Sequence, residues 1–380
     1  MQQKTINKLE FPKIIEKLSG FCTFQVSKDI AEGLKPFESL AEAAQGQQET
    51  SEAKEVLRLY PGLPLTGFRD VRPDLRKVEI GGVLQPTELL DISGTLQGGR
   101  RLKKFILELP HKYPLLKAQG ESAGVFKDLE EKIKRCIADD AEVVDQASPE
   151  LGSLRRQIKN LQAKVKDRLD NIIRSAEYQK VLQDPIITLR DGRYVIPVKQ
   201  EYRSQVPGIV HDQSASGATL FIEPLAVVEM DNELRRVIAQ EKQEVERILR
   251  ELTRAVGAYL EQIRETLRVL GYMDFIFAKG KLSAQMDAGE PKINERGIVN
   301  IIRGRHPLIQ GKPVPVTLHI GRDFDTMVIT GPNTGGKTVT LKTVGLFCIM
   351  AQSGLHVPGD EGTELSIFDQ MFADIGDEQS

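Results

Sequence analysis

A narrow stripe of apolar residues constrains the fold more than any other feature of this sequence. Between positions 151 and 172 apolar side chains recur at spacings of three, four, three, four, four and three residues. They are Leu151, Leu154, Ile158, Leu161, Val165, Leu169 and Ile172. One narrow stripe of this period is typical of a long helix in a hairpin or coiled coil. Ser148 and Pro149 supply an N-cap and a proline at the first helical position, so we expect a helix over 148–183.

A second stripe of the same kind starts near Pro224 and continues to about Leu282. Its members include Leu234, Ile238, Val245, Leu249, Leu252, Val256, Ile263, Leu267 and Leu270. At ~1.5 Å rise per residue, roughly 50 residues of this pattern would form one rod on the order of 70 Å long. The sequence therefore predicts an arm that goes out along one long helix and returns along another.

The segment between the two stripes has the pattern of a small β-sheet. Over 184–224 the apolar period becomes two, and β-branched residues flank Asp191-Gly192, a strong turn signal between strands. "SASGATLFIEP", at 214–224, reads as a further strand after a loop of small residues. We expect this sheet to lie between the two helices, at the end of the arm.

A phosphate-binding loop is predicted near the end of the sequence. Gly331, Gly336, Lys337 and Thr338 satisfy G-x-x-x-x-G-K-[ST], with "TMVIT" before the motif as a strand and "VTLKTVGLFCIMAQ" after it as a helix. Glycines let backbone N–H groups approach phosphates, Lys337 would reach the β- and γ-phosphates, and the Thr338 hydroxyl would bind Mg²⁺. The candidate ATP-binding residues are Gly331, Pro332, Asn333, Thr334, Gly335, Gly336, Lys337 and Thr338.

Acidic residues near the end of the chain are the candidates for a second magnesium ligand. They are Asp369, Asp374, Asp377 and Glu378, and "QMFAD" has the pattern of an apolar strand that ends in Asp. We favour the simpler interpretation, a strand edge with solvated acids. Only 42 residues follow Thr338, fewer than the remaining strands and helices of a P-loop domain require. We therefore leave the catalytic residues unassigned and do not expect ATP turnover from these residues alone.

Positive charge is concentrated on the predicted arm and its sheet. The whole chain carries a net charge of −2, but residues 151–203 contain 12 Lys and Arg against 6 Asp and Glu. On the helix over 155–180 we favour an ordinary solvated face. On the sheet, a structural role and contact with nucleic-acid phosphates are equally supported. The candidate phosphate contacts are Arg190, Arg193, Lys199 and Arg203. His211 is interpreted as a loop residue and His306 as structural.

Several classes of protein are excluded by composition. The three cysteines lie far apart with no C-x-x-C pair, and the five histidines are scattered, so neither a disulfide framework nor a metal-ligand spacing is present. The longest apolar run, "VGLFCIMA", has eight residues, whereas spanning a bilayer takes about 20. Nothing at the N-terminus has the pattern of a secretory signal. We expect a cytoplasmic protein with no membrane partner.

The first 140 or so residues alternate short helical patterns with turns. "LEFPKIIEKLSGFC" and "AEAAQGQQETSEAKEVLRLY" are predicted helices, and "YPGLPLTGFRD" is a predicted loop. "PTELLDISGTLQGGRRLKKFILELP" is predicted to form a helix capped by Thr87, with a weak point at Gly98-Gly99. These segments form a mostly helical region before the arm.

"TGPNTGGKT", preceded by "GRHPLI" and by a helical arm with a small sheet, resembles the bacterial MutS superfamily. "SASGATLFIEP" and "FADIGDEQS" are similar to its type-two branch, which has no mismatch-reading domain. The resemblance covers the whole chain and implies a multidomain α+β fold. It implies a helical core at 1–147, an outgoing lever helix at 148–183, a β clamp at 184–224, a returning helix at 225–290, and part of an ABC-type ATPase domain at 291–380.

The resemblance also implies a function. Members are ATP- and Mg²⁺-dependent clamps, ATPases and endonucleases that dimerise through their ATPase and core domains. They act on branched DNA in recombination suppression, or on the ribosomal RNA of collided ribosomes. In the family "FADIGDEQS" precedes the strand with the acidic pair, which speaks against Asp374 as the magnesium ligand. That pair, the ABC signature and the Smr nuclease domain have no counterpart here, so about half a member is implied, with nucleotide binding and no nuclease.

Two other classes of protein are weighed against this one. The first is a coiled-coil scaffold that binds proteins and keeps a vestigial nucleotide loop. Salt dependence separates it from a clamp, because phosphate contacts weaken steeply as salt rises. The second is an ABC-type chromosome-structuring ATPase. That class places its phosphate loop near the N-terminus, before the coil, whereas here the loop follows the arm.

Overall fold

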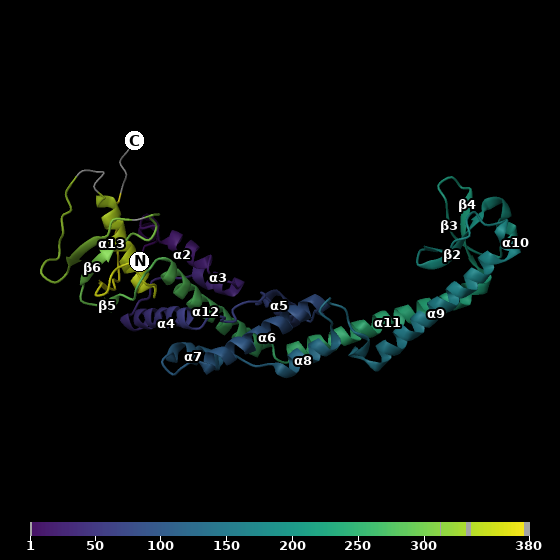
Figure 1. Ribbon diagram of the computed structural model, residues 1–380, viewed down its shortest axis with the longest axis horizontal. Helices are drawn as coiled ribbons and strands as arrows, with labels where there is room; N and C mark the ends of the chain where they lie inside the picture. Colours follow the sequence, from purple (N-terminus) through teal and green to yellow (C-terminus); the bar gives the residue numbers. More distant parts are fainter. Residues whose placement is uncertain (1, 312, 332–335, 376–380) are drawn as a thin grey trace. The chain divides into compact units, whose positions relative to one another are not determined.

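The computed structural model describes residues 2–311, 313–331 and 336–375 and has a mixed α+β fold (Figure 1). The chain divides into two compact units. Unit 1 comprises 1–79, 91–130 and 258–380, and unit 2 comprises 80–90 and 131–257. Within the described ranges each unit contains one four-stranded sheet and several helices. No helix in these ranges is long and apolar enough to cross a membrane.

Unit 1 is built on helices that pack around α12, Leu260–Gln285. The others that lie wholly in this unit are α1 (Gln3–Lys8), α2 (Phe11–Ser19), α3 (Gln25–Glu32), α4 (Leu40–Leu59), α5 (Arg72–Glu79), α7 (Pro114–Ser122) and α13 (Lys337–Gln352). α3 and α4 make the most extensive contacts with α12. The core joins the two ends of the chain, because Phe11 and Ile14 of α2 share one buried cluster with Phe275 of α12 and Phe347 of α13.

Helix α6, Pro86–Glu108, corrects two details of the sequence analysis. It begins at Pro86, before the predicted cap Thr87, and it runs through Gly98 and Gly99 without a break. A Cβ on Gly98 would lie 3.1 Å from the Phe68 ring, and one on Gly99 would lie 2.8 Å from Leu270 Cδ1. The two glycines therefore mark a close packing contact and not a weak point. Helix α8, Lys127–Cys136, follows α7 in the chain.

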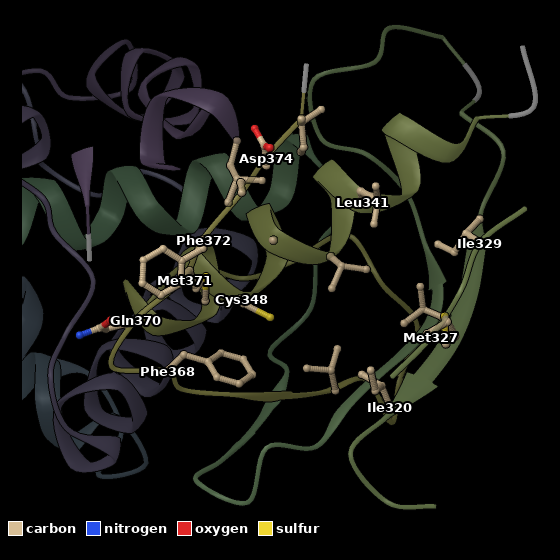
Figure 2. A pocket seen from close by; sticks show the side chains of 17 residues that line it. Ile320, Met327, Ile329, Leu341, Cys348, Phe368, Gln370, Met371, Phe372 and Asp374 are labelled. Carbon is tan, nitrogen blue, oxygen red and sulfur yellow. The ribbon is translucent and has the colours of Figure 1, made fainter. Parts of the chain in front are cut away.

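The sheet of unit 1 has the order β5-β8-β6-β7, with β5 and β8 parallel and β6 antiparallel to both of its neighbours. The strands are β5 (Lys292–Asn294), β6 (Val299–Gly304), β7 (Val316–Ile320) and β8 (Glu364–Ser366). The predicted strands "TMVIT" and "QMFAD" do not form, so both predictions are wrong. Each segment lacks a neighbouring strand, within the described residues, that could take up its backbone hydrogen bonds. Both segments instead line an apolar pocket of about 500 Å³ beside α13 (Figure 2).

Unit 2 contains α9, Pro149–Arg174, packed against α11, Leu225–Gly257. The helix predicted over 148–183 is therefore shorter than expected, because the backbone becomes extended at Ser175 (ψ 141°). The predicted cap is confirmed, because the Ser148 hydroxyl accepts a hydrogen bond from the Leu151 amide at 3.0 Å. The short helices η1 (Asp145–Ala147) and α10 (Ala176–Gln179) flank α9. The prediction of one continuous returning helix is wrong, because α11 ends at Gly257 and α12 starts at Leu260. Glycine is a poor helix former, and the backbone leaves the helical conformation at Tyr259 (φ −114°).

The sheet of unit 2 has the order β1-β2-β4-β3 with antiparallel neighbours throughout. Its elements are β1 (Thr188–Arg190), β2 (Arg193–Lys199), η2 (Gln200–Gln205), β3 (Gly208–Gln213) and β4 (Thr219–Pro224). The predicted turn is confirmed: Asp191 and Gly192 have φ of 47° and 71°, and Arg190 pairs with Arg193. Strand β3 was not predicted. Val165 and Leu169 of α9 pack with Ile196, Ile222 and Leu234 in the core below the sheet.

Candidate nucleotide and nucleic-acid sites

The glycines at the two ends of the predicted phosphate-loop motif both have positive φ. Gly331 has φ +142° and Gly336 has φ +78°, conformations that favour glycine, and α13 begins directly afterwards at Lys337. Predicted residues Pro332, Asn333, Thr334 and Gly335 lie outside the described residues. The described residues thus include both ends of the motif and the helix whose N-terminus would face an anion.

Lys337 and Thr338 occupy the first turn of α13. The Lys337 ammonium donates a hydrogen bond to the carbonyl oxygen of Gly331, six residues earlier, so this side chain turns back across the motif. Thr338 is exposed and carries the hydroxyl that the motif uses as a ligand to nucleotide-bound Mg²⁺. The residue types and their order therefore fit ATP with Mg²⁺.

A pocket of about 600 Å³ opens beside Thr338. Its lining comes from α13, from α2 and from the segment after β6, and consists of Glu10, Lys13, Glu16, Lys17, His306, Leu308, Ile309, Gln310, Thr338, Val339 and Lys342. Glu10 accepts hydrogen bonds from Lys13 and, at 3.1 Å, from Lys342, and these bonds hold the pKa of its carboxyl below the usual value. Burial lowers the pKa of His306, which favours a neutral imidazole.

The contribution of α2 to this pocket was not predicted. Glu10 and Lys342 are separated by 332 residues in the chain. Nothing in the local sequence of α2 indicates a ligand, since "FPKIIEKLS" reads as an amphipathic helix with three core positions. Only the packing of α2 against α13 brings these charges beside the motif.

The predicted acidic candidates do not form a metal site in the described residues. Asp374 is fully exposed, and its carboxylate accepts a hydrogen bond from Lys8 at 3.0 Å. Asp377 and Glu378 lie outside the described residues. Across the described part of the chain no group of three or more His, Cys, Asp or Glu side chains could hold a metal ion. The interpretation of Asp374 as a solvated acid is consistent with this exposure.

Two of the four basic residues predicted on the small sheet reach solvent. The Arg190 guanidinium lies 4.1 Å from the centre of the Phe221 ring and forms an ion pair with Asp212 at 2.9 Å. Lys199, at the end of β2, donates a long hydrogen bond of 3.4 Å to the carbonyl of Lys180. The Arg190 side chain is 39% exposed, and the bond of Lys199 lies at the surface, so neither is enclosed by the sheet.

The other two basic residues are engaged inside the unit. Arg193 lies 3.2 Å from Glu223 and 3.6 Å from Asp231, and both carboxylates are fully buried. Arg203 donates to the carbonyl oxygens of Val206 and Gly208, each at 3.0 Å. These contacts give Arg193 and Arg203 a structural role in the sheet.

His211 lies in β3 and not in a loop, which corrects its interpretation. Its Nε2 atom is 2.6 Å from an oxygen of Glu223, so the imidazole belongs to the same buried polar cluster as Arg193. Burial and the neighbouring Glu223 raise the pKa of Asp231. The cluster therefore carries two carboxyl groups in close contact beneath the sheet.

The outer face of α9 is rich in exposed positive charge. Its exposed basic residues with no ion pair among the described residues are Arg156, Lys159, Lys164, Lys166, Arg168 and Arg174. The opposite face carries Leu151, Leu154, Val165 and Leu169, which are buried. Solvation of the helix accounts for such a face, and the same charges would add to any attraction for a polyanion.

Comparisons with known proteins identify the family. Residues 327–380 match the family model described as MutS domain V. The chain is 50% identical over 380 residues to the Endonuclease MutS2 of Pelotomaculum thermopropionicum, which covers 100% of this chain and 48% of that protein. It is 48% identical over 383 residues to the Endonuclease MutS2 of Alkaliphilus oremlandii, covering 100% of this chain and 48% of that relative.

A further relative is the Putative endonuclease MutS2 of Bacillus subtilis, which is 47% identical over 384 residues, 100% of this chain and 49% of that protein. The chain thus spans about half the length of the curated relatives it matches. The sequence identity to the three relatives is nearly the same, and the matched region includes both units of the fold. The chain therefore belongs to the MutS superfamily, in the type-two branch of the MutS2 proteins.

Proposed function

We propose that this chain binds ATP with Mg²⁺ at the phosphate-loop motif and binds nucleic acid through the sheet of unit 2. The observation that supports the first part best is the start of α13 at Lys337, directly after the left-handed Gly336. In this proposal unit 2 supplies the lever, formed by α9 and α11, and the clamp, formed by β1 to β4. The proposal keeps the expected boundaries at 147, 183 and 224 and the ATPase segment from 291, and it ends the returning lever helix with α11 at Gly257.

At the nucleotide site the chain's own residues bind and orient. Backbone amides from Gly331 to Gly336, with Asn333 and Thr334 between them, would hold the phosphates, and Lys337 would exchange its bond to Gly331 for the β- and γ-phosphates. Bound Mg²⁺ would neutralise phosphate charge, with Thr338 among its ligands. Lys13 and Lys342 border the adjacent pocket, but both donate to Glu10, so the proposal assigns them no phosphate contact.

At the clamp we propose Arg190 and Lys199 as the phosphate contacts, with Arg193 and Arg203 holding the sheet that presents them. Contacts of this type carry no sequence preference and weaken with salt. The proposed partner is branched DNA or ribosomal RNA, and the proposed assembly is a homodimer through the ATPase and core regions. The relatives are named endonucleases. For these residues we propose binding alone, without strand cleavage or ATP turnover.

The test of the nucleotide site is Lys337→Ala, with Lys4→Ala as a control because Lys4 lies on α1, outside the motif and the adjacent pocket. Equilibrium binding of a fluorescent ATP analogue in the presence of Mg²⁺ should be lost in the first variant and kept in the second. Since Lys337 lies at the surface end of α13, the circular dichroism spectrum should not change. Equal affinity in the two variants would refute the phosphate-loop assignment.

The alternative is a coiled-coil protein-binding scaffold with a vestigial nucleotide loop. The internal engagement of Arg193 and Arg203 favours it, because two of four predicted phosphate contacts have structural partners. Retention of single-stranded and branched DNA and of ribosomal RNA should be measured between 50 and 300 mM salt. A steep loss of retention favours the clamp, whereas no retention at the lowest salt favours the scaffold.

A further inference from the structure

One side of the sheet of unit 2 carries an arginine placed over an aromatic ring. The Arg190 guanidinium, at the end of β1, lies over the Phe221 ring of β4, 4.1 Å from its centre. Phe221 is partly buried, and the Arg190 side chain is 39% exposed. The guanidinium therefore covers the ring and itself borders solvent. These two groups are called the Arg190–Phe221 stack.

Asp212 of β3 holds this stack in place through an irregularity in its strand. A β-bulge between Val210 and Asp212 shifts the register, so that Asp212, and not His211, pairs with Phe221. Paired residues of antiparallel strands share a face, so the bulge brings the Asp212 carboxylate to the Phe221 side of the sheet. There it forms an ion pair with Arg190 Nε at 2.9 Å. Bulges that redirect a side chain in this way are frequent beside functional sites.

The contacts of Arg190 leave one face of its guanidinium and part of its edge available. Nε is paired with Asp212, and Nη1 donates a hydrogen bond to the carbonyl oxygen of Leu189 at 3.1 Å. A guanidinium has five N–H donors in one plane, so these two contacts do not exhaust them. The Phe221 ring covers one face of that plane, so the exposed part of Arg190 belongs to the other face and the remaining edge.

Lys199 lies on the same face of the sheet as the stack. In the pairing of β2 with β4, Pro197 is opposite Phe221 and Lys199 is opposite Thr219. Residues two apart in a strand share a face and, at ~3.3 Å rise per residue, lie roughly 7 Å apart. The opposite face of these strands is buried against α9. A stacking surface and an ammonium group are thus side by side on the outer face.

We propose that the Arg190–Phe221 stack binds an unpaired base of a nucleic-acid strand while Lys199 contacts a phosphate beside it. The inference rests on the proposed nucleic-acid binding by unit 2 and narrows the partner to nucleic acid with unpaired nucleotides. Guanidinium planes and aromatic rings accept unstacked bases, and every base has a face to offer, so no sequence preference follows. A base inside a duplex is covered by its neighbours, so single strands, loops and open junctions are favoured over continuous duplex.

Phosphate attraction alone accounts for less of this geometry. A flexible lysine meets a phosphate as a point charge, whereas Arg190 is fixed by a ring beneath it and a carboxylate at its edge. The charge of Asp212 also weakens the attraction of the stack for a phosphate, but it leaves stacking with a neutral base unaffected. Arg190 therefore contributes mainly its face, and Lys199 contributes the larger share of the phosphate attraction.

The test compares two ligands of equal charge on the full 380-residue chain. One is a short single-stranded thymidine oligonucleotide, and the other is the abasic sugar-phosphate strand of the same length, each labelled with a fluorophore. Fluorescence anisotropy at low salt gives both affinities. The chain should bind the thymidine strand at least about fivefold more tightly, the lower end of what one stacked base contributes.

Matched variants assign the preference to the stack. Arg190→Lys keeps the charge but removes the planar group, so the preference for the thymidine strand should disappear while the salt slope stays the same. Phe221→Leu, which removes the ring beneath Arg190, should reduce the preference at a native circular dichroism spectrum. Arg236→Lys is the control, because it makes the same change on the exposed surface of α11, where Arg236 pairs with Glu233. It should keep the preference.

Each outcome decides between the two levels of the proposal. Equal affinity of the unsubstituted chain for both strands would overturn the stacking inference and leave the phosphate contacts in place. A preference that survives Arg190→Lys would also overturn it, because the base would then bind elsewhere. No binding of either strand at low salt would overturn nucleic-acid binding by unit 2 as a whole.

Discussion

Gly46 of α4 and Gly354, two residues after the end of α13, meet backbone to backbone. A Cβ on Gly46 would lie 3.0 Å from the Cα of Gly354, and a Cβ on Gly354, which has φ +69°, would lie 2.8 Å from the Cα of Gly46. Around this contact Gln47 donates to the carbonyls of Ala351 and Leu355, and Thr50 donates to that of Gly354. Two segments about 300 residues apart are thereby held in one position within unit 1.

Gly46→Ala should destabilise unit 1 by about 1–3 kcal/mol, because a new methyl group has no space against Gly354. Gly94→Ala, in α6, is the matched control: nothing lies within 4 Å of its Cβ position. There alanine should stabilise the helix by about 0.5–1 kcal/mol. Urea unfolding followed by circular dichroism measures both. Stabilisation by both alanines would show that the contact relaxes without strain.

His356 should make stability depend on pH. Burial, aided by the charge of Lys54, lowers the pKa of His356 from 6.5 to about 3. The imidazole contacts the hydroxyls of Ser51 and Ser283 at 3.0 and 2.8 Å. Between pH 6.5 and 3 the folded state therefore binds fewer protons than the unfolded state. The contribution of neutral His356 to the free energy of unfolding is complete above pH 6.5, and below it this contribution falls by up to about 1.4 kcal/mol per pH unit.

The measurement is urea unfolding between pH 7.5 and 5, compared with His356→Asn. The variant lacks the titrating ring, so its stability should change less over this range, whatever its absolute value. The remaining titratable groups are common to both proteins and cancel in the comparison. Parallel curves would show that His356 takes up its proton in the folded state as readily as in the unfolded state.

The buried pair of Lys279 and Glu49 should show strong coupling. Both side chains are almost completely buried, with Lys279 Nζ 3.4 Å from Glu49 and 3.1 Å from the carbonyl of Gly46. The Tyr272 hydroxyl donates to the same carboxylate at 2.9 Å. Lys279→Met alone should cost about 3 kcal/mol, because it leaves Glu49 buried without a cation.

The double variant Glu49→Leu, Lys279→Met removes both charges and should recover most of that loss, since hydrophobic replacements of buried pairs are often neutral. A double-mutant cycle from urea unfolding gives the coupling energy. Additive effects of the two substitutions would contradict the assignment of a paired buried charge. In that case water or Tyr272 alone would compensate the carboxylate.

Arg193 and Lys199 should separate stability from nucleic-acid binding. Arg193→Met leaves the fully buried Glu223 and Asp231 without their guanidinium and should destabilise unit 2 by about 3 kcal/mol. Lys199→Met should leave the unfolding midpoint unchanged and lower the salt slope of nucleic-acid retention by about 1. Retention that is unaffected by Lys199→Met at low salt would remove this residue from the proposed interface.

Sequence patterns were sufficient to predict elements that depend only on residues close to them in the chain. The α9 start at Ser148 and the Asp191-Gly192 turn are confirmed, because a cap and a two-residue turn depend on neighbouring residues. The break between α11 and α12 was missed. The apolar stripe continues across Gly257, and periodicity alone does not register a two-residue interruption.

Elements that depend on distant partners were predicted less well. The side chains of "TMVIT" alternate in direction as in a strand, but the segment does not form one. A strand needs a neighbouring strand for its backbone hydrogen bonds, and the sequence pattern does not show which segment that neighbour would be. Similarly, Arg193 was recognised as basic, whereas its buried partners Glu223 and Asp231 become apparent only in the fold. The motif at Gly331 to Thr338 was read directly, since its residues are consecutive.

The hydrogen bonds from α4 to the carbonyls at 351–355 have a mechanical consequence. α13 is a helix of 16 residues, and α4 is hydrogen-bonded to its C-terminal end at Ala351 and to Gly354 just beyond it. A displacement of α13 at its phosphate-loop end would therefore also displace α4. A polypeptide cut to contain only the segment from β5 onward would leave those carbonyls open to water, along with the apolar side of α13 that α2 now covers. Such a piece would associate or precipitate before it reported on nucleotide binding.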